Sequence, residues 1–142
     1  MNIQKISLNN FRNYEEQDVE FENGINIIYG NNGEGKTNII ESIYLSSIGK
    51  SFRTSKEKEL IKFNKDFCKI NIDFQKSDRE ANLKIDINDK KSIYLNNIKL
   101  KKTSEILGNI YMVLFNPNDM DILRQGPIKR RQFLNIMISQ LR

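Results

Sequence analysis

A stretch of eight residues in the first third of the chain constrains its fold more than any other feature. It fits the pattern G-x-x-x-x-G-K-[ST], which is that of a phosphate-binding loop, or P-loop. Glycine lets the backbone curl so that successive N–H groups point inward and lie close to phosphate oxygens. The predicted nucleotide-binding residues are Gly30, Asn31, Asn32, Gly33, Glu34, Gly35, Lys36 and Thr37.

Two side chains of this stretch carry the predicted chemistry. Lys36 supplies a mobile positive charge for the β- and γ-phosphates, and the Thr37 hydroxyl is a ligand for the Mg²⁺ that bridges the same phosphates. A helix that starts near Lys36 directs its positive N-terminal end at the anion. Because none of these groups acts as an acid or a base, the absence of histidine from the chain is no obstacle.

The segments on either side of the P-loop have the expected character. Residues 25–29 (INIIY) are rich in isoleucine and predict a buried strand. From Lys36 to about Ser47 apolar residues recur at helical spacing, which predicts a helix that stops at Gly49. The simpler alternative is a glycine-rich turn that contains a Lys-Thr pair by chance.

The remaining segments predict a sheet and further helices. Strand-like patterns occur at residues 3–11, 18–21, 68–75, 83–87 and 92–95. Asn-containing turns separate the last three, so we expect an antiparallel β-meander over about residues 67–100.

Helical turns and one more strand complete the expected elements. We expect a short helix at residues 56–63 and a helical turn at 103–107 with Thr103 as N-cap. An apolar run at 110–115 predicts another buried strand, and Pro127 fits the first turn of a final helix with an apolar stripe (Phe133, Leu134, Met137, Ile138 and Leu141). The predicted fold class is α/β, with a P-loop core at 25–50, the meander, and a C-terminal strand and helices at 110–142.

Composition excludes several kinds of protein. The 142 residues correspond to roughly one domain. The absence of histidine excludes histidine-activated nucleophiles and His-containing zinc sites. The single cysteine, Cys68, excludes a disulfide framework and is expected in the core of the meander. No apolar run can span a bilayer, and the N-terminus lacks the apolar centre of a signal peptide, so we expect a cytoplasmic protein.

Positive charge concentrates in the later part of the chain. The net charge is −4 for residues 1–35, +4 for 36–71 and +5 for 72–142. A basic surface favours anionic partners such as nucleic acid, although a solvated lysine-rich surface is the simpler interpretation of charge alone. Cations at the start of a helix oppose its dipole, which suggests another reason for them. The candidate DNA-binding residues are Lys129, Arg130 and Arg131, with Arg53 and Lys56 as further candidates.

Two separated parts of the chain resemble one family of bacterial proteins. ISLNNFRNY, followed by NGINIIYGNNGEGKTNIIESIYLSSIGKSFR, is similar to the amino-terminal part of RecF. LFNPNDMDILRQGPIKRRQFL, at residues 114–134, resembles the F-x-P-x-D and G-x-P-x-x-R-R-x-F-L motifs of the same family. RecF proteins are DNA replication and repair ATPases related to the SMC and ABC-type ATPases. The resemblance covers essentially the whole chain but less than half of a typical member.

The resemblance implies an ATP-binding head of the ABC/SMC type, of which this chain is the first lobe. Two such heads sandwich two ATP molecules in a homodimer, which binds DNA near single-strand gaps. With RecR and RecO, proteins of this type help to load the recombinase RecA on gapped DNA, which feeds the SOS response to DNA damage. The expected cofactors are therefore ATP and Mg²⁺, and the expected partners are DNA, RecR and RecO, with no membrane.

Further residues acquire expected roles from the same resemblance. Arg12 and Tyr14 are expected near the nucleotide, where an arginine can contact phosphate and an aromatic ring can stack. The alternatives are a surface Arg12 and a packed Tyr14. Asp119 is expected either to border the nucleotide or to stabilise the start of a short helix. Glu41 and Asn38, one turn into the helix after the P-loop, are expected to cap that helix or to lie at the surface.

Two motifs of a complete ATPase of this type are absent from the chain. Asn116 follows the last predicted strand where a Walker B motif has Asp, and no Gly-Gly pair of a signature loop occurs. We therefore expect an amino-terminal fragment that binds nucleotide weakly and hydrolyses it poorly. Two alternatives stay open: a small P-loop kinase or GTPase, and a nucleotide-dependent interaction module that does not hydrolyse. The chain lacks the N-K-x-D motif of a GTPase and shows few late arginines for a kinase lid.

Overall fold

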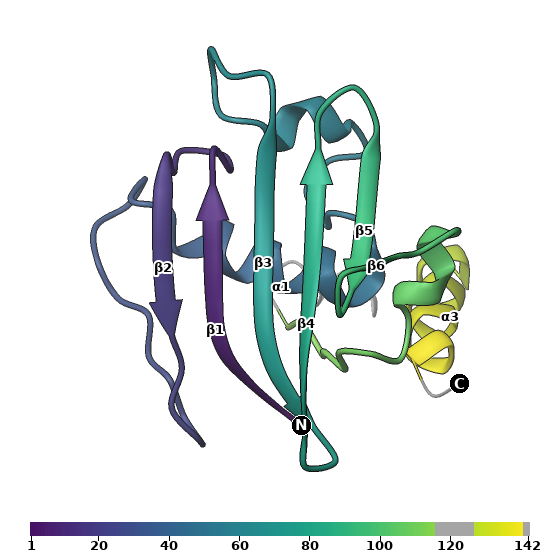
Figure 1. The fold of residues 1–142 in the computed structure, drawn as a ribbon. Helices are drawn as coiled ribbons and strands as arrows, with labels where there is room; N and C mark the ends of the chain where they lie inside the picture. The colour runs from purple at the N-terminus through teal and green to yellow at the C-terminus, as the bar shows by residue number, and fades with distance from the viewer. Residues whose placement is uncertain (116–126, 141–142) are drawn as a thin grey trace.

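Six strands form one antiparallel sheet in the computed structural model, which describes residues 1–115 and 127–140. The strand order is β2-β1-β3-β4-β5-β6 (Figure 1). The bounds are β1 (Asn2–Asn9), β2 (Glu16–Glu20), β3 (Cys68–Lys76), β4 (Arg79–Ile87), β5 (Lys91–Leu95) and β6 (Ile98–Lys99). The predicted meander is confirmed as β3 to β6, and β1 extends the sheet by pairing with β3.

Alternation along the strands places the core on one face of the sheet. In β3 every second residue from Cys68 to Phe74 is buried, and the register sets Ile70 opposite Ile85 of β4. Apolar pairs of this kind across neighbouring strands stabilise a sheet on its covered face. Burial, together with the negative charge of Asp86, raises the pKa of the Cys68 thiol to about 12. The predicted core position of Cys68 is therefore confirmed.

Helix α1 (Lys36–Ile48) packs across this apolar face, behind the sheet in Figure 1. Its buried side chains include Ile39 and Leu45, which join the core cluster of the strands. The helix ends at Gly49, whose φ is 80° and whose N–H donates to the Leu45 carbonyl at 2.8 Å. Since glycine adopts this left-handed conformation without a steric penalty, the predicted stop at Gly49 is confirmed.

The short helices differ in detail from the expectation. The predicted helix at residues 56–63 is only one 3₁₀ turn, η1 (Glu57–Leu60), and a second 3₁₀ turn is η2 (Thr103–Ile106). The prediction of Thr103 as N-cap is wrong, because the residue at that position is Lys102. The Lys102 N–H donates to the Glu105 carboxylate at 3.1 Å, which closes the turn one residue earlier.

Two segments predicted as buried strands are not strands in the structure. Residues 25–29 and 110–115 pair with no strand of the described part of the chain. Ile25, Ile27 and Val113 are 93%, 79% and 78% exposed. A strand needs a neighbour to take up its backbone hydrogen bonds, so a local apolar pattern alone does not make one.

The final helix α3 (Pro127–Gln140) is confirmed from Pro127 onward. Its apolar stripe stays largely uncovered, since Leu134 and Ile138 are 54% and 53% exposed. The Gln140 side-chain amide joins the helix to residues 110–115, because it accepts from the Met112 N–H and donates to the Met112 carbonyl. Leu141 lies outside the described residues. No helix within the described ranges is long and apolar enough to cross a membrane.

Candidate nucleotide-binding site

The P-loop (residues 30–37) is a tight turn at the start of α1. Gly33 and Gly35 have φ angles of 88° and 105°, in the left-handed region that favours glycine. A Cβ atom on Gly35 would lie 2.5 Å from the Tyr14 hydroxyl oxygen, so a side chain has no room there. The backbone conformation itself therefore requires the glycines of the motif.

The Lys36 ammonium group lies on the backbone of the P-loop. Its Nζ donates to the carbonyl oxygens of Gly30 and Asn31, at 2.8 and 2.6 Å. The charge is thus held at the N-terminal end of α1, where the helix dipole also attracts anions. Thr37 beside it is exposed. A cation, a helix N-terminus and an accessible hydroxyl at one place suit a phosphate group with a bound metal ion.

Glu34 forms hydrogen bonds within the P-loop. Its carboxylate accepts hydrogen bonds from the Asn31 backbone N–H and from the Asn31 side-chain amide, both at 2.8 Å. These hydrogen bonds, and to a lesser degree the charge of Lys36, hold the pKa of Glu34 below its ordinary value. Glu34 therefore stays ionised at neutral pH and fixes the first half of the loop.

The turn between β1 and β2, residues 10–14, lies against the P-loop. The Asn13 side-chain nitrogen donates to the Gly33 carbonyl at 3.2 Å, and its oxygen accepts from the Asn38 side chain at 2.7 Å. Tyr14 of the same turn is half-buried beside the loop. Burial raises the pKa of Tyr14, and the nearby charge of Glu34 raises it further.

Arg12 and Glu41 form a bidentate ion pair between this turn and α1. Arg12 Nε donates to one carboxylate oxygen of Glu41 at 2.9 Å and Nη2 to the other at 2.6 Å. Its Nη1 donates to the Glu59 carbonyl at 2.7 Å. Burial alone would raise the pKa of Glu41, but hydrogen bonds from Arg12 and Ser51 and the charges of Arg12 and Arg53 outweigh it and lower the pKa.

The expected surface or capping role of Glu41 is wrong, because its side chain is fully buried. A signal for this was present in the sequence: Glu41 lies one turn before Leu45, on the face of α1 that the sheet covers. Sequence reasoning also gave Asn13 no role. Asn38 neither caps α1, whose N-cap is Gly35, nor is fully exposed.

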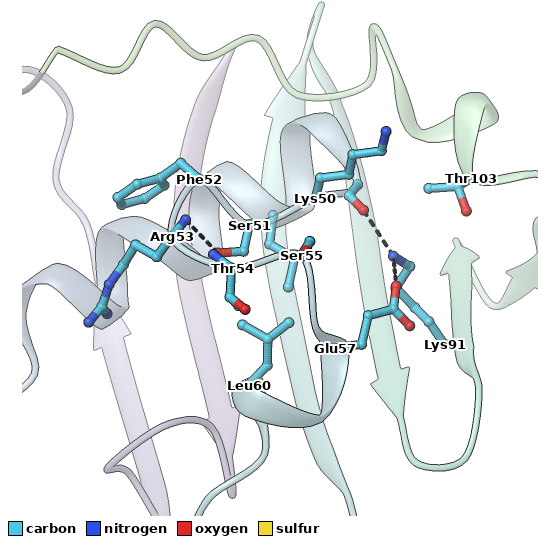
Figure 2. A pocket seen from close by; sticks show the side chains of 12 residues that line it. Lys50, Ser51, Phe52, Arg53, Thr54, Ser55, Glu57, Leu60, Lys91 and Thr103 are labelled. Atoms are coloured by element: carbon cyan, nitrogen blue, oxygen red, sulfur yellow. Dashed lines mark hydrogen bonds and ion pairs between the residues drawn. The ribbon is translucent and has the colours of Figure 1, made fainter. Parts of the chain in front are cut away.

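A pocket of about 720 Å³ lies beside the loop that follows α1, away from the P-loop itself. Its lining includes Lys50, Ser51, Arg53, Thr54 and Lys91. Figure 2 shows Lys91 turned toward Glu57 on one side, while Arg53 extends to the opposite side. The Arg53 Nη1 atom donates there to the Asn38 side-chain oxygen at 2.6 Å and lies 3.1 Å from the Glu41 carboxylate.

The structure places the predicted site residues in two separate regions. Arg12 lies near the P-loop, because the next residue, Asn13, donates a hydrogen bond to the Gly33 carbonyl. The Arg12 guanidinium, however, is paired with Glu41. A contact between Arg12 and a nucleotide therefore stays a prediction. Arg130 and Arg131 are exposed near the start of α3. In Figure 1, α3 lies beyond β5 and β6, whereas the chain before α1 lies at the β2 end of the sheet. The Lys129 side chain and the whole of Asp119 lie outside the described part.

Comparison with known proteins agrees with this arrangement. A family profile described as an AAA domain matches residues 5–140. The chain belongs to the AAA domain family.

The relatives of this AAA domain narrow the resemblance further. The chain is 46% identical, over 99% of its length, to the DNA replication and repair protein RecF of Clostridium acetobutylicum, and it spans 39% of that relative. A solved structure described as the recombination mediator protein RecF-ATP in the RecFOR pathway matches with a TM-score of 0.92 and 39% identity, over 99% of this chain and 40% of that one.

A more distant structure shows the fold alone. The SMC head domain from Thermotoga maritima matches this AAA domain with a TM-score of 0.61 and 20% identity, over 75% of this chain and 41% of that one. The predicted resemblance to RecF and the predicted α/β head of the ABC/SMC type are therefore confirmed. The alternative of a small kinase or GTPase is not favoured.

Proposed function

We propose that residues 30–37 bind ATP together with Mg²⁺. The observation that carries this proposal is the position of Lys36, whose ammonium group is held on the P-loop carbonyls at the N-terminal end of α1. A phosphate chain that enters the loop would meet this cation and the positive end of the helix dipole together, and backbone amides are the further contacts that a P-loop offers. Support also comes from the RecF-ATP structure, because 99% of this chain matches 40% of that protein.

The loop fits Mg²⁺ as well as phosphate. Mg²⁺ commonly takes only one or two ligands from the protein and completes its shell with phosphate oxygens and water. The exposed Thr37 hydroxyl can be the protein ligand. No group of three or more acidic or Cys side chains that could hold a metal ion occurs among the described residues, so a site completed by the phosphates is the arrangement that fits. Bound Mg²⁺ would neutralise phosphate charge.

We further propose that the protein acts as RecF does in DNA replication and repair. In this proposal it binds DNA in an ATP-dependent way as a homodimer and helps, with RecR and RecO, to load recombinase at single-strand gaps. The identity to RecF supports this, although the chain spans only 39% of that relative. Arg130 and Arg131, exposed on α3, and Lys129 between them and Pro127 are the proposed DNA contacts.

Nucleotide binding without efficient turnover is the proposed behaviour of these 142 residues by themselves. The P-loop supplies a cation for the phosphates, but Asn116 follows residues 110–115 where a Walker B motif has Asp. Hydrolysis of ATP needs a group that orients the attacking water. An ATPase of the ABC type takes that group from its Walker B motif and the acidic residue after it, and this chain shows neither that motif nor a Gly-Gly signature loop. Measurable steady-state turnover by this chain would contradict the proposal.

The direct test is a titration of the protein with ATP and Mg²⁺. We expect saturable binding with a preference for ATP over GTP, and a loss of affinity of at least about tenfold in Lys36→Ala, because a charge-assisted phosphate contact disappears. The matched control is Lys90→Ala, which removes an exposed cation from the meander and should bind as the parent does. Equal ATP affinity of the parent and Lys36→Ala would overturn the proposed site.

A further inference from the structure

Residues 10–14 are held in a turn that costs conformational energy. Asn10 and Arg12 have φ angles of 51° and 56°, a region that residues other than glycine seldom occupy. Backbone hydrogen bonds hold the turn against residues 60–62: Arg12 N–H donates to the Leu60 carbonyl and Lys62 N–H to the Asn10 carbonyl, both at 2.8 Å. Strained turns persist where the surroundings determine them, and they concentrate at functional sites.

The next residue of this turn begins a chain of side-chain hydrogen bonds. Asn13 donates to the Gly33 carbonyl and accepts from Asn38, and Asn38 accepts in turn from Arg53. The three distances are 3.2, 2.7 and 2.6 Å. Each asparagine amide therefore uses its nitrogen as donor and its oxygen as acceptor, which fixes its orientation. Arg53, at the far end, lines the pocket beside α1 (Figure 2).

This hydrogen-bonded chain acts on one peptide group of the P-loop. Because the peptide bond is planar and trans, the Gly33 C=O and the Glu34 N–H point in opposite directions. When the Asn13 side chain binds the Gly33 carbonyl, the Glu34 N–H therefore points away from Asn13. In the structure this N–H points back across the loop, with the Asn31 carbonyl at 3.5 Å. An amide this far from its acceptor is available to a stronger one.

We propose that Asn13 and Asn38 are positioning residues for nucleotide binding, which orient the Gly33–Glu34 peptide group and link it to Arg53. This inference rests on the proposed ATP site. Neither asparagine touches the nucleotide in this proposal. Asn13 holds the peptide group, Asn38 holds Asn13, and Arg53 holds Asn38.

The test compares ATP affinity and thermal stability in single and double variants. Asn13→Ala and Asn38→Ala should each weaken ATP binding about three- to tenfold, since one hydrogen bond contributes a free energy of that size. Because Asn38 acts through Asn13, the double variant should bind ATP no worse than Asn13→Ala alone. Arg53→Ala should weaken ATP binding in the parent more than in Asn38→Ala, where only its contact with Glu41 is left to lose.

The matched control is Asn71→Ala, which removes an asparagine that accepts from Asn82 at 2.9 Å in the sheet, away from the P-loop. It should leave ATP affinity unchanged even if it lowers the melting temperature. Additive losses in the double variant, or parental ATP affinity in a folded Asn13→Ala, would overturn the inference. If Asn13→Ala does not fold, the Glu34 amide resonance of Asn38→Ala decides, because the inference requires it to shift.

The failure of this inference and that of the proposed function are distinguishable. If Lys36→Ala loses ATP while both asparagine variants bind as the parent does, the ATP site stands and the positioning role is wrong. If Lys36→Ala also binds as the parent does, the site itself is wrong.

Discussion

At the scale of single residues, the buried carboxylate of Glu41 is the most exacting feature of the fold. It accepts from Arg12 and Ser51 and lies beside Arg53, so each of its oxygens has a partner. A buried ion is costly unless it is paired and hydrogen-bonded, and removal of a partner commonly costs about 3–5 kcal/mol. The pair therefore fixes the turn of residues 10–14 on α1, beside the P-loop.

The Glu41 carboxylate gives stability a pH dependence of known sign. Its pKa is lower in the folded protein than the ordinary value of 4.5, so its contribution is complete above that value and is lost as the pH falls through the lower, folded value. Glu41→Gln should be less stable near neutral pH and should lose less stability on acidification. Urea unfolding at several pH values measures both effects.

The comparison variant is Glu80→Gln, which changes an exposed glutamate of β4. It should follow the parent at every pH. If Glu41→Gln and the parent lost the same free energy of unfolding between pH 7 and the acid range, the ion pair would not stabilise the fold.

At the scale of elements, helix α1, which follows directly on the P-loop, depends on the glycine that caps its C-terminal end as much as on its first residue. Gly49 has a φ of 80°, and a Cβ atom there would lie 2.6 Å from the Thr103 methyl carbon. The C-terminal end of α1 therefore packs directly against η2, with no room for a side chain at Gly49. Two penalties, backbone strain and a steric clash, apply to any side chain at this position.

Gly49→Ala should therefore destabilise the protein more than Gly24→Ala. Gly24 has a φ of 97° but no atom within 4 Å of its Cβ position. A side chain at Gly24 therefore meets the backbone strain but no steric clash. We expect Gly24→Ala to cost about 1 kcal/mol and Gly49→Ala about 2–4 kcal/mol. Thermal unfolding of both variants checks this, and equal losses would show that Thr103 moves aside at little cost.

The sequence predicted some elements well for a physical reason. In the meander and in α1, the period of the apolar residues and the turn or stop residue both come from the local sequence, and the partner strand is the next one along the chain. Residues 25–29 and 110–115 have equally apolar sequences, but whether they form strands depends on neighbours that a local pattern does not specify.

In the candidate site, too, the local sequence predicts some residues and does not predict others. The P-loop residues follow from glycine geometry and from the lysine and threonine of the motif, which are local properties. The contacts of Asn13 and Glu41 are made across 20 and 29 positions of the chain, and spacing alone does not show them.

At the scale of the whole molecule, the two proposed activities occupy different ends. The P-loop belongs to the β2 end of the sheet, and Arg130 and Arg131 belong to α3 beyond β6 (Figure 1). Nucleotide and DNA would therefore not compete for the same side chains. Each can be altered without direct damage to the other.

Loss of two phosphate contacts should appear in the salt dependence of DNA binding. Arg130→Ala with Arg131→Ala should reduce the slope of log affinity against log salt by about two, because each neutralised phosphate releases about one counterion. ATP affinity should not change. The control pair, Arg79→Ala with Lys90→Ala, removes the same charge from exposed positions of the meander. An unchanged slope in the α3 variant would remove these arginines from the DNA surface.

The buried thiol of β3 has a practical consequence. Cys68 has no exposed surface and a pKa of about 12, so in the native sheet it is almost never a thiolate and no reagent can reach it. It is the only sulfhydryl in the chain. Its alkylation rate should therefore report how often β3 separates from its neighbouring strands. If ATP binding at one end of the sheet stabilises the whole sheet, ATP should slow the alkylation. Cys68 is thus a built-in chemical probe for the opening of the sheet.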